Sequence, residues 1–181
     1  DGDRHRHGAG RTLDFRLAVQ CLPARLRRDG AARQVASQYP MARPLVLILG
    51  GTGVFGRRIA ANLVKSRDLD LVLAARDGAA AATFERALGI DRAASLEVDL
   101  AKSNAIQRLL DAKPAVIVDT AGPFQSRNLA LPRRCAERGI HYVDIADGRA
   151  RVLEIASLDA VARLEHAAVI SGASTVPALT T

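Results

Sequence analysis

At 181 residues and 49% hydrophobic content, the chain can form one well-packed domain and is too short for two ordinary domains. Residues 1–40 carry +4 of the net charge of +7, and the mildly basic remainder lacks the clusters of basic and aromatic residues that typify nucleic-acid binders. No apolar run approaches the roughly 20 residues of a membrane-spanning helix, so neither nucleic acid nor a membrane is an expected partner.

Cysteine and histidine usage indicates the compartment and argues against a metal site. The two cysteines, Cys21 and Cys135, fit neither a disulfide framework nor a zinc site, so a reducing cytoplasm is the expected location. His5 and His7 lie in an arginine-rich stretch with no other ligands nearby. We interpret both histidines as solvated side chains and expect no metal.

The first forty residues differ from the rest of the chain. They are rich in arginine and show no sustained periodicity, and the only methionine, Met41, lies four residues before the first expected strand. We therefore expect residues 1–40 to be a disordered or non-native extension and residues 41–181 to form the domain. A targeting sequence is the alternative, because residues 13–26 could form a short basic amphipathic helix, although four acidic residues and the lack of a serine-rich run weaken it.

The stretch after Pro44 predicts a strand, a glycine-rich turn and a helix. Five aliphatic residues, Leu45–Leu49, suit a strand that is buried on both faces. The glycines that follow satisfy both G-x-G-x-x-G and G-x-x-G-x-x-G, and the N–H groups of a helix N-terminus attract a pyrophosphate. Apolar residues then recur at helical spacing and are expected to share one helix face: Phe55, Ile59, Leu63 and Val64. We predict that a dinucleotide binds the run Gly50, Gly51, Thr52, Gly53, Val54, Phe55 and Gly56; a structural turn that binds nothing is the alternative.

A second strand is expected at residues 69–75, and the residue after it bears on the choice of cofactor. Arg76 lies twenty residues beyond Gly56, where a dinucleotide-binding fold places the residue that meets the adenosine ribose. An arginine there pairs with the 2′-phosphate of NADP, whereas an acidic residue accepts hydrogen bonds from the ribose of NAD. Arg76 therefore favours NADP over NAD. Asp77 either faces the ribose or, as we favour, caps a helix over residues 79–88 that ends at Gly89.

Two further strand ends carry candidate cofactor residues. A strand at residues 95–98 ends at Asp99, which either lines the adenine pocket or caps a helix over residues 103–111. A buried strand at residues 115–118 leads to Ala121 and Gly122, whose small size would let the backbone approach the nicotinamide side of the cofactor. A tight turn without a ligand is the alternative for this second segment.

The last part of the chain continues the alternation of helices and strands. His141 and Tyr142 are candidate acid or base groups, but within a strand such residues more often serve packing and a local hydrogen bond, so the catalytic residue is unassigned. Ser174 or Thr175 would cap a further helix opened by Pro177, and we interpret the end at Thr181 as truncation. The expected elements are a helix over 127–138 with Pro132 in its first turn, a strand over 140–145, helical sequence over 149–166 with a break near Ser157, and a strand over 167–170.

Six strands alternating with helices predict an α/β fold with a doubly wound, mostly parallel sheet of the Rossmann type. In such a sheet, ligands bind in the crevice outside the carboxyl ends of the strands. The glycine turn, Arg76, Asp99 and Ala121–Gly122 all follow strand ends, and their convergence is stronger evidence than any one of them.

These residues resemble the NADP-binding domain of saccharopine dehydrogenase-like oxidoreductases. The resemblance runs from about Met41 to the C-terminus and is carried by three blocks: Gly50 to Gly56, Ala121-Gly122-Pro123-Phe124, and Cys135 through Gly139-Ile140-His141-Tyr142-Val143-Asp144. It implies a nicotinamide-dependent oxidoreductase with the glycine turn, Arg76 and Ala121–Gly122 on the cofactor. It also implies that a substrate domain, absent from this chain, supplies substrate specificity and much of the catalytic machinery.

Two classes of function follow from these observations. The first is an NADP-dependent oxidoreductase, present as its cofactor domain, that acts on an unknown small molecule and is compatible with a homo-oligomer. The second is a non-catalytic NAD(P)-binding sensor related to atypical short-chain dehydrogenases, because Gly50-Gly51-Thr52-Gly53 also opens such proteins. A catalytic short-chain enzyme would carry Tyr-x-x-x-Lys, but Ala146 stands four residues after Tyr142 and Arg43 four after Tyr39. A long α+β continuation of the reading frame would support the oxidoreductase, and a natural stop near Thr181 would support the sensor.

Overall fold

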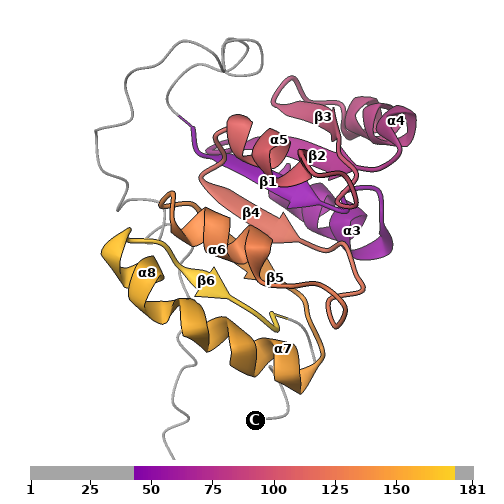
Figure 1. Cartoon of the computed structure of the whole chain (residues 1–181). Helices are drawn as coiled ribbons and strands as arrows, with labels where there is room; N and C mark the ends of the chain where they lie inside the picture. The colour runs from indigo at the N-terminus through magenta and orange to yellow at the C-terminus, as the bar shows by residue number, and fades with distance from the viewer. Residues whose placement is uncertain (1–42, 174–181) are drawn as a thin grey trace, which may run out of the picture.

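A single parallel sheet forms the centre of the molecule (Figure 1). The structure, a computed structural model, describes residues 43–173. Within this range the sheet has the strand order β3-β2-β1-β4-β5-β6, and each neighbouring pair is parallel. The strands are β1 Leu45–Leu49, β2 Asp70–Ala75, β3 Ala93–Glu97, β4 Val116–Asp119, β5 His141–Asp144 and β6 Val169–Ile170. The predicted doubly wound sheet is confirmed, and it is parallel throughout these pairings.

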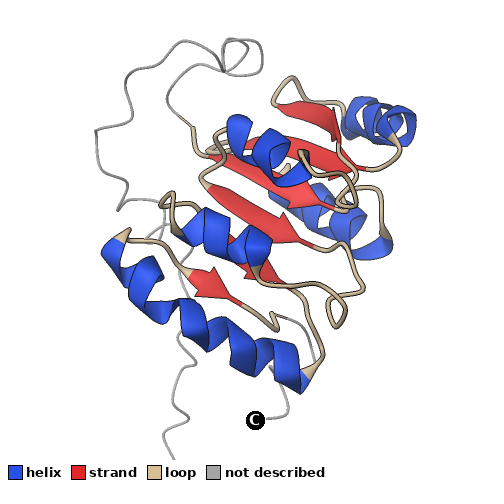
Figure 2. Ribbon diagram, viewed as in Figure 1, coloured by secondary structure: helices blue, strands red, loops and turns tan. Residues whose placement is uncertain are grey.

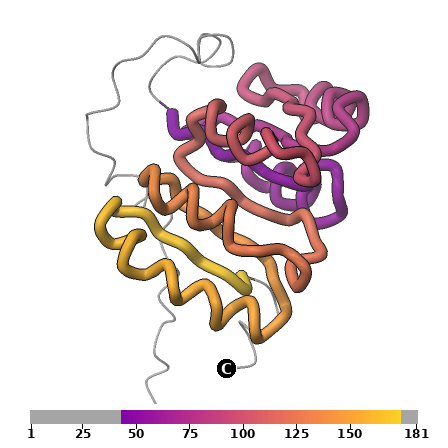
Figure 3. The backbone as a smooth tube through the Cα atoms, viewed as in Figure 1, coloured from indigo at the N-terminus to yellow at the C-terminus, as the bar shows by residue number. Residues whose placement is uncertain are grey.

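The path of the chain explains where a ligand crevice can form. The path through the sheet begins at β1, moves outward to β2 and β3, and returns past β1 to β4, β5 and β6 on the other side (Figure 3). The direction of winding therefore reverses between β1 and β4, which are neighbours in the sheet. In an open α/β sheet this reversal is the place where ligands bind, outside the carboxyl ends of the two strands.

Helices cover both faces of the sheet (Figure 2). The strand β1 is buried on both sides, because Val46 and Ile48 belong to one apolar cluster and Leu47 and Leu49 to the other. The first cluster receives side chains from α3 Val54–Leu63 and α4 Gly78–Leu88. The second receives them from α5 Ala105–Asp111, α6 Ala130–Ala136 and the 3₁₀ turn η1 Ile155–Leu158, which joins α7 Arg149–Glu154 to α8 Asp159–Leu164.

Local sequence signals set several helix ends as expected. The Asp77 side chain accepts a hydrogen bond from the Ala80 N–H at 2.9 Å, and Gly89 ends α4 with a φ of +63°, so both predicted caps are present. Pro132 lies in the first turn of α6. The predicted break near Ser157 is the η1 turn. The α6 helix is shorter than predicted, because it begins at Ala130 rather than at residue 127.

Phe55 is the clearest departure from the predicted packing. The sequence placed it on the apolar face of α3, but its side chain is 58% exposed. The helix begins at Val54, so its first turn lies beyond the end of β1 at Leu49, and no part of that strand remains for Phe55 to pack against. Ile59, Leu63 and Val64 do pack on the apolar cluster that contains Val46 and Ile48, as predicted.

Some sequence-based predictions concern residues outside the described range. These are the nature of residues 1–40, the domain start at Met41, and the helix start at Ser174, Thr175 and Pro177. Over residues 43–173, no helix is long and apolar enough to cross a membrane.

Candidate functional site

The glycine turn is fixed by backbone hydrogen bonds at the carboxyl end of β1. The N–H groups of Gly50 and Gly51 both donate to the Ala74 carbonyl, at 2.8 and 3.1 Å. The Gly53 N–H donates to the Gly50 carbonyl at 2.9 Å, and Arg57 N–H donates to Gly53 O at 2.9 Å, which starts α3. The turn therefore stays in place through β2 and its own backbone.

Close backbone approach explains why glycine occupies the two ends of the turn. A Cβ atom on Gly56 would lie 2.3 Å from the Gly50 carbonyl oxygen and 2.8 Å from Gly51 Cα. Gly50 has a φ of +79°, a conformation that other residues rarely adopt. These two positions therefore accept glycine alone without a shift of the backbone.

The turn leaves the N-terminus of α3 open to an anion. Gly53 is the N-cap, no side chain caps the helix, and no acidic residue lies in the first turn. The first N–H groups of a helix have no partner within it and carry a partial positive charge. Val54 and Phe55 are 68% and 58% exposed at this end. The residues present thus fit the pyrophosphate of a dinucleotide, which needs donors and close backbone approach.

Arg57 connects the glycine turn to α4. Its Nε donates to the Thr52 carbonyl at 2.8 Å, and its guanidinium lies 4.7 Å from the centre of the Phe84 ring. Both contacts hold the exposed outer side of the turn in place.

Arg76 and Asp99 lie at the ends of neighbouring strands. Arg76 directly follows β2, is exposed, and has no ion-pair partner among residues 43–173. The Val98 N–H donates to the Ala75 carbonyl at 2.8 Å, so the chain before Asp99 is attached to the end of β2, which Arg76 follows. The Asp99 carboxylate accepts from the Ala101 N–H at 3.0 Å. It therefore caps the turn before α5 and not α5 itself, whose N-cap is Asn104.

The turn after β4 contacts the glycine turn. Thr120 Oγ1 donates to the Leu49 carbonyl at 2.8 Å and lies 3.2 Å from the Gly50 carbonyl. A Cβ atom on Gly50 would be 3.0 Å from the Ala121 nitrogen. Gly122 is exposed and adjoins this contact. The structure therefore brings Gly50 and Ala121, which are far apart in sequence, to one point between β1 and β4.

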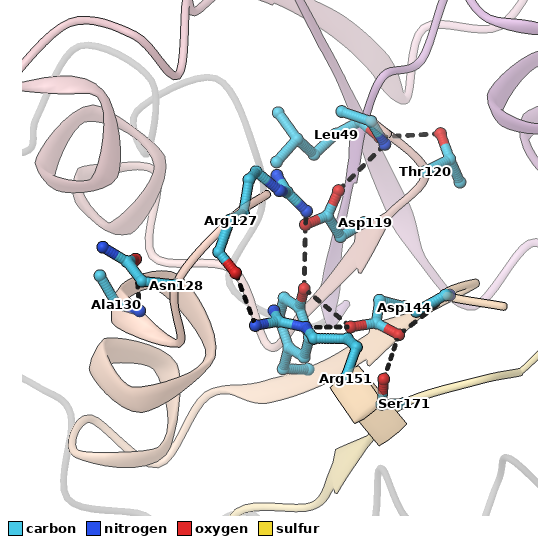
Figure 4. Close-up of polar contacts among 12 residues, drawn as sticks. Leu49, Asp119, Thr120, Arg127, Asn128, Ala130, Asp144, Arg151 and Ser171 are labelled. Atoms are coloured by element: carbon cyan, nitrogen blue, oxygen red, sulfur yellow. Dashed lines mark hydrogen bonds and ion pairs between the residues drawn. The ribbon is translucent and has the colours of Figure 1, made fainter. Parts of the chain in front are cut away.

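A buried polar network lies beside this point, and the sequence did not predict it (Figure 4). The Tyr142 hydroxyl donates to Asp119 Oδ2 at 2.9 Å and lies 3.3 Å from Asp144 Oδ2. Arg127 pairs with Asp119, and Arg151 Nε lies 3.8 Å from Asp144 Oδ2. Asp119, Tyr142 and Asp144 have no exposed surface. A pocket of about 240 Å³ adjoins the network and has Tyr142, Arg127 and Arg151 in its wall.

Burial shifts the pKa values of this region. It raises the pKa of Asp119, and the opposing charge of Arg127 only partly offsets the effect. Burial, together with the charges of Asp119 and Asp144, raises the pKa of Tyr142. Burial also raises the pKa of the Cys135 thiol to about 12, so that cysteine stays protonated at neutral pH. Tyr142 is thus a neutral hydrogen-bond donor between two carboxylates.

His141 has a structural partner. Its Nδ1 accepts a hydrogen bond from the Ala168 N–H at 2.9 Å, which joins β5 to the segment before β6. Burial lowers the pKa of His141, so the neutral form that accepts this bond is favoured. The packing interpretation of His141 is supported, and the same holds for Tyr142, whose hydroxyl is occupied by carboxylates.

One signal in the sequence could have indicated part of the network. Tyr142 and Asp144 stand two residues apart in a strand, so their side chains point to the same face. Asp119 ends the neighbouring strand in the same register, paired with Asp144. The contributions of Arg127 and Arg151 come from a turn and a helix, and no spacing rule predicts them.

Three solved structures that share the fold are dehydrogenases by their descriptions. Saccharopine dehydrogenase (L-Glu forming) from Saccharomyces cerevisiae aligns with a TM-score of 0.56 and 18% identity, over 72% of this chain and 27% of that one. A short-chain dehydrogenase from Sphingobium yanoikuyae in complex with NADPH aligns at 0.52 and 19%, over 71% of both chains. The bulky-bulky ketone specific alcohol dehydrogenase from Comamonas testosteroni aligns at 0.51 and 16%, over 71% and 70%. At these identities the likeness establishes the fold alone.

The family assignment rests on a match between this chain and the model of a protein domain family. No curated protein matches the chain by sequence. The model of the saccharopine dehydrogenase NADP binding domain matches residues 46–173, which include the glycine turn, Arg76 and the network. The prediction of NADP as the cofactor is confirmed at the level of this family. The chain spans about a quarter of the length of the yeast saccharopine dehydrogenase. It belongs to the saccharopine dehydrogenase NADP-binding domain family.

Proposed function

We propose that residues 41–181 act as the cofactor domain of an NADP-dependent oxidoreductase whose substrate is a small molecule, in the cytoplasm. The observation that carries this proposal is the convergence of the glycine turn, Arg76 and Ala121–Gly122 at the carboxyl edge of one parallel sheet. The bound nicotinamide cofactor would exchange a hydride with the substrate. The residues of this chain would bind and orient the cofactor.

Each part of the cofactor has a proposed partner. The N–H groups at the start of α3 would bind the pyrophosphate, with Gly50, Gly51, Gly53 and Gly56 allowing its approach. Arg76 would pair with the 2′-phosphate, because its guanidinium is exposed at the end of β2. Asp99 would lie at the adenine side. Thr52, Val54 and Phe55 would lie along the pyrophosphate, and Ala121 and Gly122 beside the nicotinamide.

The test is the effect of Arg76→Ala on the affinity for NADPH and for NADH, measured by calorimetry on the full chain. Loss of the charged contact to the 2′-phosphate should cost about 1.5 to 3 kcal/mol for NADPH and little for NADH. The matched control is Arg86→Ala, an exposed arginine in the last turn of α4, which should change neither affinity. Equal losses for both nucleotides in the Arg76 variant would contradict the role of Arg76.

A non-catalytic NAD(P)-binding sensor is the second candidate. The observation that favours it is the burial of Tyr142 between two carboxylates, which removes this tyrosine as a proton donor to a bound substrate. Both candidates predict NADPH binding. They differ in hydride transfer, which an oxidoreductase would catalyse and a sensor would not.

A further inference from the structure

The Tyr142 hydroxyl contacts the carboxylates that end two adjacent strands, and one of these carboxylates also binds the turn after a third strand. Asp119 ends β4 and Asp144 ends β5, and the Tyr142 hydroxyl lies 2.9 and 3.3 Å from one oxygen of each. The second oxygen of each carboxylate binds the turn that follows a strand. Asp119 Oδ1 accepts from the Ala121 N–H at 3.0 Å, and Asp144 Oδ1 accepts from Ser171 Oγ at 2.6 Å and the Gly172 N–H at 3.1 Å, just after β6.

Two arginines compensate the buried charges. Arg127 pairs with Asp119, and Arg151 with Asp144. Arg151 also donates to the carbonyl of Arg127 at 3.3 Å, which connects the two pairs. Burying carboxylates is costly unless they are paired and hydrogen-bonded, so the two aspartates depend on this geometry. Removing the Tyr142 hydroxyl should therefore disturb the ends of both β4 and β5.

The turn at Ala121 is held from two sides. On one side, Thr120 Oγ1 donates to the Leu49 carbonyl next to the glycine turn. On the other side, Asp119 holds the Ala121 N–H, and Tyr142 holds Asp119. The glycine turn is held by the Ala74 carbonyl and its own backbone, and its one bond from the turn after β4, Thr120 Oγ1 to the Gly50 carbonyl at 3.2 Å, comes from a residue outside the network. Loss of the Tyr142 hydroxyl would thus affect Ala121 and leave the glycine turn intact.

We propose that Tyr142 is a positioning residue that fixes the Ala121–Gly122 turn for the nicotinamide half of the cofactor and ties it to the end of β6. This inference rests on the proposed function. Tyr142 acts through Asp119 and Asp144 and touches neither cofactor nor substrate. If Tyr142 acts in this way, the adenine half of the cofactor should bind independently of Tyr142.

The experiment compares NADPH with 2′,5′-ADP, which has the 2′-phosphate and adenosine but no nicotinamide. Affinities of both are measured by calorimetry for the full chain, for Tyr142→Phe and for Val143→Ala. Phenylalanine removes only the hydroxyl. Val143 is the matched control, because it is the next residue of β5 and packs on the opposite face of the sheet. Melting temperatures establish that each variant is folded.

Tyr142→Phe should weaken NADPH binding about tenfold, because the lost hydrogen bond to Asp119 sets the upper limit on how far the Ala121–Gly122 turn can loosen, and should leave 2′,5′-ADP binding unchanged. Val143→Ala should change neither affinity. If Tyr142→Phe does not fold, Ser171→Ala, which removes one of the donors to Asp144 Oδ1, should give a smaller loss with the same selectivity for NADPH.

The outcomes separate this inference from the proposed function. Unchanged NADPH affinity in Tyr142→Phe, or equal losses for both ligands, would overturn the positioning role while normal binding by the unmodified chain upholds the cofactor domain. An unmodified chain that is folded and binds neither ligand would overturn the proposed function and this inference with it.

Discussion

Single residues decide whether the glycine turn can exist. The turn needs Gly50 for its positive φ and Gly56 because the Gly50 carbonyl oxygen occupies the space of a side chain. Gly53 is less constrained, since its Cβ atom would meet only the Gly50 oxygen, at 3.2 Å. The spacing of these glycines is a local signal, and the sequence therefore predicted the turn. Asp119 gave no such signal, and the only local signal for Asp144 was its spacing of two residues from Tyr142 in a strand.

Gly56→Ala should destabilise the protein by about 3 kcal/mol, because the atoms in the way are backbone atoms that cannot rotate aside. Gly148→Ala is the control: its φ is −79° and its Cβ atom would meet only the Gln125 side chain, at 3.4 Å, so a cost of no more than about 1 kcal/mol is expected. Denaturant unfolding of both variants measures the difference. Equal midpoints would show that the turn adapts to a methyl group.

At the scale of elements, the order of strands and helices was predictable and their lengths were less so. β1 and the caps of α4 follow from apolar runs, Asp77 and Gly89, which act over a few residues. β6 is only two residues long, shorter than predicted, and lies at the edge of the sheet. Its attachment depends on contacts from β5, among them the hydrogen bond from Ala168 N–H to His141 Nδ1. Such a long-range partner is not visible in the local pattern.

Protonation of His141 should weaken the attachment of β6 to β5. The pKa of His141 in the fold is below its usual value of 6.5, so the neutral histidine contributes stability above about pH 6.5 that is lost as the pH falls through the lowered pKa. His141→Asn retains an acceptor in the same place but does not titrate. The stability advantage of the parent over this variant should shrink by at most about 1 kcal/mol on acidification.

Unfolding free energies from pH 7.5 to 4.5 provide the measurement for His141. His166→Asn serves as the control, because His166 is exposed and its φ of +54° suits asparagine. The curve of His166→Asn is the reference with which that of His141→Asn is compared. Parallel curves for the parent and His141→Asn would show that His141 does not contribute to the pH dependence.

At the scale of the whole molecule, the strand order assembles the site. The order places β1 between β2 and β4, so the residues after Leu49, Ala75 and Asp119 meet at the carboxyl ends of these three strands. The sequence predicted this convergence because ligand crevices in doubly wound sheets lie at strand ends. It could not predict the link from Tyr142 to Asp119, because that link depends on the register of β4 against β5, nor the two arginines, which come from later segments.

The central claim is that NADP binds at the carboxyl ends of β1, β2 and β4. It is tested most directly by the amide chemical shifts of the unmodified full chain during titration with NADPH. The amides of Gly51, Gly53 and Ala121 should shift together and saturate at one concentration. Those of α8 Asp159–Leu164, which precedes the edge strand β6 and has no residue in the network, should stay in place. Saturable shifts confined to other parts of the chain, or none at millimolar NADPH, would contradict the account.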